Sequence, residues 1–269
     1  MCLQETKLAD IDLQLVRSLL GNSFVDWEML PAIGTAGVFL LLWDRCVLEK
    51  VDSVVCQFSM SCLWKGVFDG FKWVGTGLHG PTNDGIHKDL WTELSSVRLK
   101  WDLPWCVFGD FNVVCFPSER LGCSRLSSHM MDFLDFIEEY NLVDLPLGGG
   151  PYTWGSGSDH PSRSCIDRFF VSFDWEDFYL DVCQKLMPRP LSDHYPILLE
   201  VGSMLRGKIP FRFENMRLKT EGFVDRVQSW WSSYSFSGSP SFVLACKLKA
   251  LKEDLKQWNH LEFGNVGFR

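Results

Sequence analysis

The sequence lacks the features that mark several common classes of protein. No apolar stretch approaches the roughly 18 residues of a membrane-spanning helix, and the first residues show no signal-peptide pattern. The cysteines form no Cys-x-x-Cys pair and no Cys/His spacing of a zinc site. We therefore expect free thiols, buried at Cys106 and Cys165, and an intracellular protein with no membrane partner.

Basic clusters are also missing from most of the chain. Residues 1–200 contain 15 Lys+Arg and 28 Asp+Glu, whereas residues 201–269 contain 11 and 6. An acidic body argues against a tight, nonspecific binder of the phosphate backbone, because counterion release needs clustered cations. It is compatible with a site where carboxylates hold a metal ion. The glycine turn Leu147–Pro151 has no GK[ST] ending, so we read no nucleotide-binding loop there.

The sequence is rich in apolar and aromatic residues, and these residues recur at regular spacing. The hydrophobic content of 46% excludes wholesale disorder, and 21 Phe with 12 Trp favour β-rich packing. Apolar periodicity predicts three helices in the body and a tail helix, over 8–20, 83–99, 127–140 and 240–262. Strands are predicted at Gly37–Trp43, Ser53–Met60, Leu63–Phe68, Phe71–His79, Trp105–Phe108, Ile166–Val171 and Pro196–Val201. Asp69-Gly70 marks a hairpin among the first strands, and the whole pattern predicts a mixed α/β sandwich.

One stretch carries the strongest suggestion of a site. Trp105–Phe108 is a short buried strand that delivers Asp110 and Asn112 just past its end. In an extended segment these two side chains would project from the same face. Gly109-Asp110 followed by Asn112 is also ordinary turn chemistry, so this stretch alone leaves turn and site both open.

Three further stretches place polar side chains at strand ends. Glu5 follows Leu3-Gln4, Asp167 precedes Arg168, and the adjacent pair Asp193-His194 precedes the last predicted strand. Singly, each has a plain reading, such as a surface charge, an Arg168 ion pair or a turn cap. Together they have a chemical logic, because carboxylates hold magnesium and a carboxylate beside a histidine raises its pKa.

The ordered set LQET, GDFN, IDR and SDH resembles the endonuclease/exonuclease/phosphatase superfamily. Within it, Trp105–Asn112, Gly150–Trp154 and Leu191–Pro196 are most similar to the apurinic-endonuclease-like domain of plant LINE-type non-LTR retrotransposons. Pro210–Asn215 resembles the segment that joins such a nuclease to a reverse transcriptase. The resemblance covers nearly the whole chain.

The resemblance implies a fold and a division of the chain. The fold is DNase I-like, a four-layer α/β sandwich of two packed mixed β-sheets flanked by helices. Residues 1–202 would form the nuclease-like domain, and residues 203–269 a basic linker and an amphipathic helical tail. Family members begin with a strand carrying Trp-Asn and a helix before LQET, so we expect the first strand and helix to be missing.

The resemblance also implies roles for individual residues. Glu5 matches the metal-ligand glutamate, and Asp193 a residue assisting metal or water placement. Asp110 matches the aspartate that orients the attacking water, and Asn112 its companion on the phosphate. His194 matches the histidine that contacts the scissile phosphate and Asp167 the carboxylate that orients it. His79 stands before Gly80-Pro81, where the family usually has a phosphate-contacting tyrosine.

The implied reaction is Mg²⁺-dependent nicking of DNA, with Mn²⁺ as the alternative metal. The implied partners are DNA and a reverse transcriptase domain in the parent element, and the implied location is nuclear. Two alternatives stay open: a truncated relic without catalysis and, more weakly, a phosphatase of the same superfamily. Arg206, Lys208, Arg212, Arg217 and Lys219 are equally compatible with DNA contacts and with a solvated linker. Oligomeric state is left open by the sequence.

Overall fold

The computed structural model describes residues 1–6, 11–30, 38–157, 161–179, 181–189, 192–201, 220, 222–236 and 240–263. The chain divides into two units, Met1–Leu205 and Arg206–Arg269. The linker-like segment around Pro210–Asn215, with all five basic residues considered above, lies outside the described residues.

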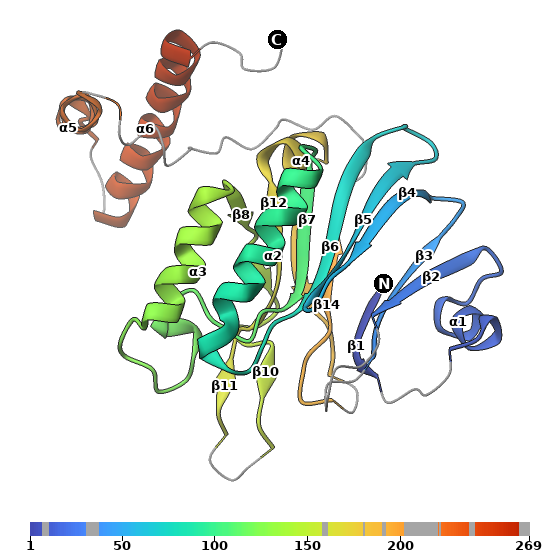
Figure 1. Ribbon diagram of the computed structural model, residues 1–269. Helices are drawn as coiled ribbons and strands as arrows, with labels where there is room; N and C mark the ends of the chain where they lie inside the picture. Colours follow the sequence, from blue (N-terminus) through green and yellow to red (C-terminus); the bar gives the residue numbers. More distant parts are fainter. Residues whose placement is uncertain are drawn as a thin grey trace. The chain divides into compact units, whose positions relative to one another are not determined.

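A six-stranded sheet in the order β4-β5-β6-β7-β12-β8 is the centre of the first unit. Strands β6 and β7 run parallel and every other neighbouring pair is antiparallel. Helices α2 (His87–Lys100) and α3 (Ser128–Glu139) lie against one face of this sheet (Figure 1). The strands are Leu48–Val55, Ser59–Gly66, Lys72–His79, Trp105–Asp110, Asp167–Ser172 and Leu142–Asp144, in sheet order.

The opposite face of the six-stranded sheet packs on two smaller sheets. One has the order β1-β3-β2 (Cys2–Thr6, Val38–Asp44 and Val25–Leu30), and α1 (Leu13–Leu20) covers its outer side. The other has the order β14-β13-β9 (Ile197–Glu200, Cys183–Leu186 and Leu147–Gly148), with α4 (Phe173–Phe178) beside it. This confirms the expected α/β sandwich of mixed sheets flanked by helices. Short elements complete the unit: 3₁₀ turns Asp84–Ile86 and Pro117–Glu119, and the ribbon of β10 (Trp154–Gly155) with β11 (Arg163–Ser164).

The apolar run of β7 follows from its position inside this sandwich. Trp105 and Val107 pack toward α2 and α3, whereas Cys106 packs on the opposite face with Val171 and Trp175. Successive side chains of a strand point to opposite faces, so a strand covered on both sides needs apolar residues throughout. The burial of this strand places Asp110, its last residue, at the edge of a rigid core.

Most predicted elements exist, but one pair of strand boundaries was wrong. The sequence placed strands at Ser53–Met60 and Leu63–Phe68, whereas the chain turns at 56–58, between β4 and β5. That turn is held by Glu93 of α2, whose carboxylate accepts the backbone N–H groups of Gln57 and Phe58 at 3.0–3.2 Å. Because Glu93 lies about 35 residues from the turn that it stabilises, the sequence near the turn does not indicate it. Strands β2 and β13 and helix α5 also went unpredicted.

The second unit contains α5 (Phe223–Ser233) and α6 (Pro240–Phe263), the latter matching the predicted tail helix. Phe223 and Trp258 pack with ring centroids 5.0 Å apart, and Lys247 Nζ donates to the Trp231 carbonyl at 3.0 Å. Leu244 and Leu248 are exposed.

All ten cysteines are free thiols, and Cys106 and Cys165 are buried as expected. Burial raises the pKa of both thiols above its ordinary value, so they stay protonated. No described helix is both long and apolar enough to cross a lipid bilayer.

Candidate active site

Three neighbouring strands of the six-stranded sheet end or begin at the same edge. His79 is the last residue of β6, Asp110 the last of β7, and Asp167 the first of β12. The register pairs Asp110 with His79 on one side and with Asp167 on the other. Residues paired across neighbouring strands stand about 5 Å apart. Sheet topology therefore brings together three predicted site residues from distant parts of the sequence.

His194 joins this group from the loop before β14. Its Nδ1 lies 3.0 Å from Oδ2 and 3.2 Å from Oδ1 of Asp167, and its Nε2 lies 4.0 Å from Oδ2 of Asp110. On the other side, His79 Nε2 lies 3.8 Å from the same Asp110 oxygen and 3.4 Å from Oε1 of Glu5. Asp110 Oδ2 thus faces two imidazole rings, one oriented by Asp167 and one adjacent to Glu5.

Burial and neighbouring charges move the pKa values in this group apart. Asp110 is only 3% exposed, and burial, together with the charge of Asp167, raises its pKa. Burial works to lower the pKa of His194, but the hydrogen bond and charge of Asp167 outweigh it and raise that pKa to about 9. Burial lowers the pKa of His79, although Glu5 opposes the shift. At neutral pH His194 is therefore a cationic donor, and His79 is neutral.

Glu5 reaches the group through an irregularity in its strand. Leu3 pairs with Leu40 and Thr6 with Val38, so two residues of β1 oppose one residue of β3. At this bulge Glu5 has φ 52°, in the left-handed region that few side chains adopt. The bulge turns the Glu5 side chain to where its carboxylate meets His79.

A second close approach fixes β1 against the six-stranded sheet. Gln4 Nε2 donates to the carbonyl of Leu78 at 2.5 Å. Gly109 has φ 136°, and a Cβ there would stand 2.0 Å from the Leu78 carbonyl oxygen and 2.6 Å from Gln4 Nε2. Only glycine fits this position, and its lack of a side chain lets β1, β6 and β7 converge beside Asp110.

Asp110 serves in a turn and faces the site at the same time. Asn112 has φ 55°, its backbone N–H donates to Asp110 Oδ1 at 2.8 Å, and its Nδ2 donates to the Gly80 carbonyl at 2.8 Å. The expectation that Asp110 and Asn112 project from one face of an extended segment was wrong, because the chain turns after Phe111. The turn leaves Oδ2 of Asp110 facing the imidazoles.

Asp193 stands at the margin of this group. Its Oδ2 accepts the indole N–H of Trp154 at 2.9 Å. Partial burial works to raise its pKa, but the Trp154 hydrogen bond and other donors outweigh it and lower that pKa. The structure thus gathers Asp110, Asp167 and His194 closely, with His79 and Glu5 beside them. Asn112 and Asp193 lie next to this group, and their side chains are hydrogen-bonded to Gly80 and Trp154.

Sequence reasoning missed two residues that hold the start of β12 in place. Thr153, fully buried, accepts the N–H groups of Ile166 and Asp167 on its hydroxyl at 3.0 and 2.9 Å. Arg168, 4% exposed, forms ion pairs with Glu119 and Asp144. The sequence offered Arg168 as a partner for Asp167, but adjacent strand residues point to opposite faces. That alternation was the available signal.

The donor set of the site suits a hard divalent cation. Asp110, Asp167 and His194 offer ligand atoms within 4.8 Å of one another, and the carboxylate of Glu5 lies close by. In the part of the chain that the structure describes, no lysine or arginine pairs with these carboxylates. A second group, Cys115, Glu119 and Asp144, is already neutralised by Arg168. Magnesium prefers carboxylate oxygens, so the carboxylates at this edge of the sheet suit it, whereas the cationic His194 is a hydrogen-bond donor and the second group does not fit.

Comparisons with known proteins agree with this architecture. The sequence model described as the endonuclease/exonuclease/phosphatase family matches residues 1–194. No curated protein matches the chain.

Three solved structures align with this chain. The endonuclease domain of TRAS1, a telomere-specific non-LTR retrotransposon, is 13% identical and covers 73% of this chain and 94% of its own, with a TM-score of 0.55. Two proteins from Bacteroides thetaiotaomicron also align. A member of the same family is 15% identical over 70% of this chain and 78% of its own, with a TM-score of 0.49. A mannosyl-6-phosphatase is 14% identical over 71% and 82%, with a TM-score of 0.48. At 13% identity, the likeness to the TRAS1 domain is one of fold.

Proposed function

This chain belongs to the endonuclease/exonuclease/phosphatase family of hydrolases, and on that premise we propose that it is a metal-dependent endonuclease that nicks one strand of DNA. The observation that carries the proposal is the arrangement Asp167–His194–Asp110. A cationic imidazole, oriented by one buried carboxylate, faces a second carboxylate whose pKa is raised. That pairing suits hydrolysis of a phosphodiester, where one group takes a proton from water and another donates to the phosphate.

The residues have distinct roles in this proposal. Asp110 orients the attacking water and accepts its proton, which its raised pKa favours near neutral pH. His194 donates from Nε2 to a phosphate oxygen, while Asp167 fixes the ring through Nδ1. Asn112 uses one amide hydrogen on Gly80, and the other reaches the phosphate. His79 lies beside Glu5 and uses its single N–H to donate to the phosphate, in place of a tyrosine hydroxyl.

Glu5 and Asp193 are the proposed ligands of the metal, Mg²⁺ with Mn²⁺ as the alternative. When bound, the cation would stabilise negative charge on the phosphate and on the leaving oxygen. Water adds to phosphorus, the bond to the 3′ oxygen breaks, and that oxygen takes up a proton. The products are a 5′ phosphate and a 3′ hydroxyl that a polymerase can extend.

DNA as substrate, and a setting beside a reverse transcriptase, follow from the ordered motifs and from the retrotransposon endonuclease among the structures of similar fold. We place catalysis in residues 1–202 and treat 203–269 as a basic linker and helical tail. A nuclear location follows from the substrate.

The test is nicking of supercoiled plasmid by the purified chain with Mg²⁺, beside Asp193→Ala and an exposed control, Lys65→Ala. We expect nicking by the natural chain and the control, and its loss in Asp193→Ala and with chelator. Folded protein without nicking would overturn the proposal and identify a catalytically inactive remnant. Hydrolysis of p-nitrophenyl phosphate without nicking would overturn it in favour of a phosphatase.

A further inference from the structure

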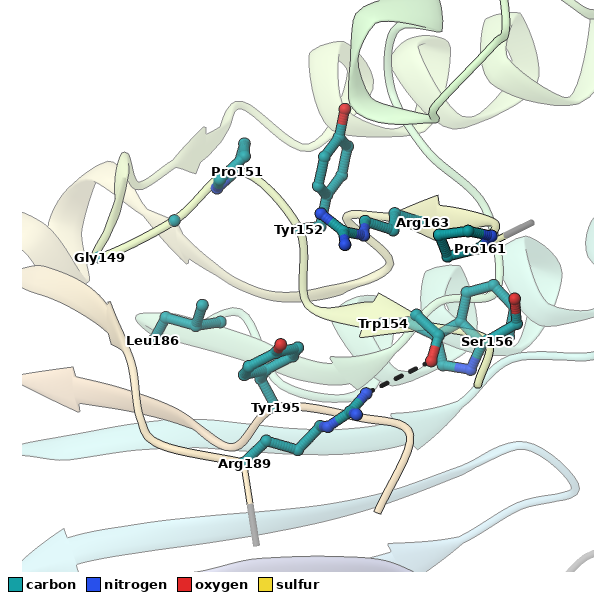
Figure 2. A pocket seen from close by; sticks show the side chains of 12 residues that line it. Gly149, Pro151, Tyr152, Trp154, Ser156, Pro161, Arg163, Leu186, Arg189 and Tyr195 are labelled. Carbon is teal, nitrogen blue, oxygen red and sulfur yellow. Dashed lines mark hydrogen bonds between the residues drawn. The ribbon is translucent and has the colours of Figure 1, made fainter. Parts of the chain in front are cut away.

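Two cavities stand out in the part of the chain that the structure describes. The larger, which Figure 2 shows, is lined by Trp154 and Tyr195 among others and adjoins the candidate active site. The smaller, of about 230 Å³, is lined by residues of α2 and α3 alone. These two helices lie side by side against one face of the six-stranded sheet (Figure 1). The groove between them shares no residue with the candidate active site.

The two helices run in the same direction along this groove. Ring contacts pair His87 with His129 near the first turns, and Trp91 with Phe133 and Phe136 one turn further along. The lining side chains follow at helical spacing: Lys88, Trp91 and Ser95 from α2, and Asp132, Asp135, Phe136 and Glu139 from α3. Residues three, four and seven apart share one helix face, so the groove extends over about 10 Å, the rise of seven helical residues.

The groove contains three carboxylates that no cation of the described chain neutralises. Asp132, Asp135 and Glu139 form no ion pair and no side-chain hydrogen bond with any residue that the structure describes. Lys88 is the single cation among the lining residues. The groove therefore carries an excess of negative charge.

The carboxylate at the end of α3 is also unfavourable for the helix that carries it. Helix α3 has no acidic residue in its first turn and no basic residue in its last turn, and it ends at Glu139. A helix C-terminus carries partial negative charge, so an acidic side chain there destabilises the helix. A cation supplied by another molecule would remove this repulsion.

Trp91 adds a hydrogen-bond donor without an acceptor. The residue is only 8% exposed, and it lines the groove. Its Nε1 is buried and has no hydrogen-bond partner among the described residues, which is unfavourable for a polar group. The ring stacks on Phe133 at a centroid distance of 5.0 Å and 8° between the planes, which holds the indole in place. A carbonyl oxygen in the groove would supply the acceptor after a shift of the flexible Lys88 side chain.

We propose that the groove between α2 and α3 binds an extended basic segment of a partner protein, with Arg or Lys at alternate positions. Alternate side chains of an extended chain project from one face about 7 Å apart, which suits carboxylates that stand one helical turn apart. The cationic side chains pair with Asp132, Asp135 and Glu139. A backbone carbonyl of the segment accepts the N–H of Trp91.

The occupant follows from these two requirements taken together. A protonated polyamine would neutralise the carboxylates but has no acceptor for the indole N–H. A nucleic acid has the wrong sign of charge for this groove. A peptide has a carbonyl at every residue, and about three extended residues span the 10 Å of the groove.

The test measures binding of the peptide acetyl-Arg-Ala-Arg-Ala-amide to the full chain in about 0.1 M salt, which screens charges beyond about 10 Å. The readout is the ¹⁵N–¹H resonance of the Trp91 indole, assigned with Trp91→Phe. We expect Asp132→Asn and Glu139→Gln each to weaken binding about threefold, the effect of losing one partly exposed ion pair, and the double variant about tenfold. Asp89→Asn, at an exposed position of α2 outside the lining, is the matched control and keeps full affinity.

Putrescine and acetyl-Glu-Ala-Glu-Ala-amide are the companion probes. Putrescine has the same positive charge as the basic peptide and no carbonyl, so it should bind at least about threefold more weakly. The acidic peptide should not bind. Equal affinity for putrescine and the basic peptide would overturn the proposal, as would unchanged affinity in the double variant or no binding of the basic peptide by the natural chain.

Thermal unfolding gives an independent readout. Because Glu139 lies at the negative end of α3, Glu139→Gln should raise the midpoint of unfolding. Asp89→Asn removes a carboxylate from the first turn of α2 and should lower the midpoint. A lower midpoint in Glu139→Gln would show that this carboxylate stabilises the fold and would overturn its assignment to a partner.

Discussion

Both carboxylate oxygens of Asp167 lie within 3.2 Å of Nδ1 of His194. The two residues are 27 positions apart in the sequence and meet because β12 begins where the loop before β14 passes. The contact fixes the ring so that Nε2 faces Asp110. It makes one imidazole a directed, charged donor, and the predictions on catalysis depend on it.

Asp167→Asn should lower the pKa of His194 from about 9 toward 6.5, because the Asn side chain keeps hydrogen bonding and removes the charge. NMR titration of the histidine nitrogens in metal-free protein measures this directly. Nicking should fall by about 10²–10⁴-fold, the usual range for lost acid–base assistance. A His194 pKa still near 9 would show that Asp110 and Asp193 supply the shift.

The same contact predicts how stability depends on pH. Since the folded-state pKa of His194 lies above its unfolded value of 6.5, its stabilising contribution is complete below pH 6.5. That contribution is lost as pH rises through about 9. Urea unfolding of metal-free protein at pH 6 and pH 9 should show this loss, and Asp167→Asn should show less of it.

Thr153→Val should destabilise the protein and impair nicking. The hydroxyl of Thr153 is the acceptor for two buried N–H groups at the start of β12. Each orphaned donor costs about 1–3 kcal/mol. Thr92→Val is the control, since Thr92 donates to a carbonyl on the exposed side of α2 and should change the unfolding free energy little. Equal effects of the two substitutions would contradict the role of Thr153.

Arg168→Ala should lower the free energy of unfolding by about 3–5 kcal/mol, because it leaves two carboxylates without their buried cation. Lys65→Ala removes an exposed ion pair with Glu49 and should change it by about 1 kcal/mol or less. Denaturant titration of both variants gives the comparison. A loss in Arg168→Ala no larger than in the control would show that water reaches the cluster.

Gly109→Ala should destabilise the protein by roughly 2–5 kcal/mol, since an unfavourable φ adds to a clash with the Leu78 carbonyl. Gly122→Ala is the matched control, because Gly122 also has positive φ but nothing lies within 4 Å of its added Cβ. That control should lose only about 1–2 kcal/mol. Thermal unfolding of the two variants separates steric conflict from backbone strain.

The local sequence pattern was sufficient to predict the elements that are stabilised by residues close together in the sequence. The apolar run Trp105–Phe108 predicted β7, and Ser127, which caps α3 by accepting the Met130 N–H, predicted that helix. The turn at 56–58 was missed because its stabilising carboxylate, Glu93, lies on another element. The same reason applies to Thr153 and Arg168, whose partners are distant in sequence.

The candidate site divides in the same way. Strand ends identified Asp110, Asp167 and His194, because polar residues after apolar runs are visible locally. The bulge at Glu5 was not visible, since glutamate rarely adopts the left-handed region. The turn at Asn112 was one of the two readings that the sequence left open, because asparagine tolerates that region.

The left-handed backbone of Glu5 creates a trade-off between the stability of the fold and the chemistry of the candidate site. Glycine would adopt that φ without the roughly 1 kcal/mol penalty that a side chain pays. Selection for thermal tolerance alone would therefore enrich Glu5→Gly, which discards the carboxylate beside His79. A copy of this gene released from selection for cleavage would be free to drift toward that change, whereas in a chain that cleaves DNA the carboxylate would have to outweigh the penalty.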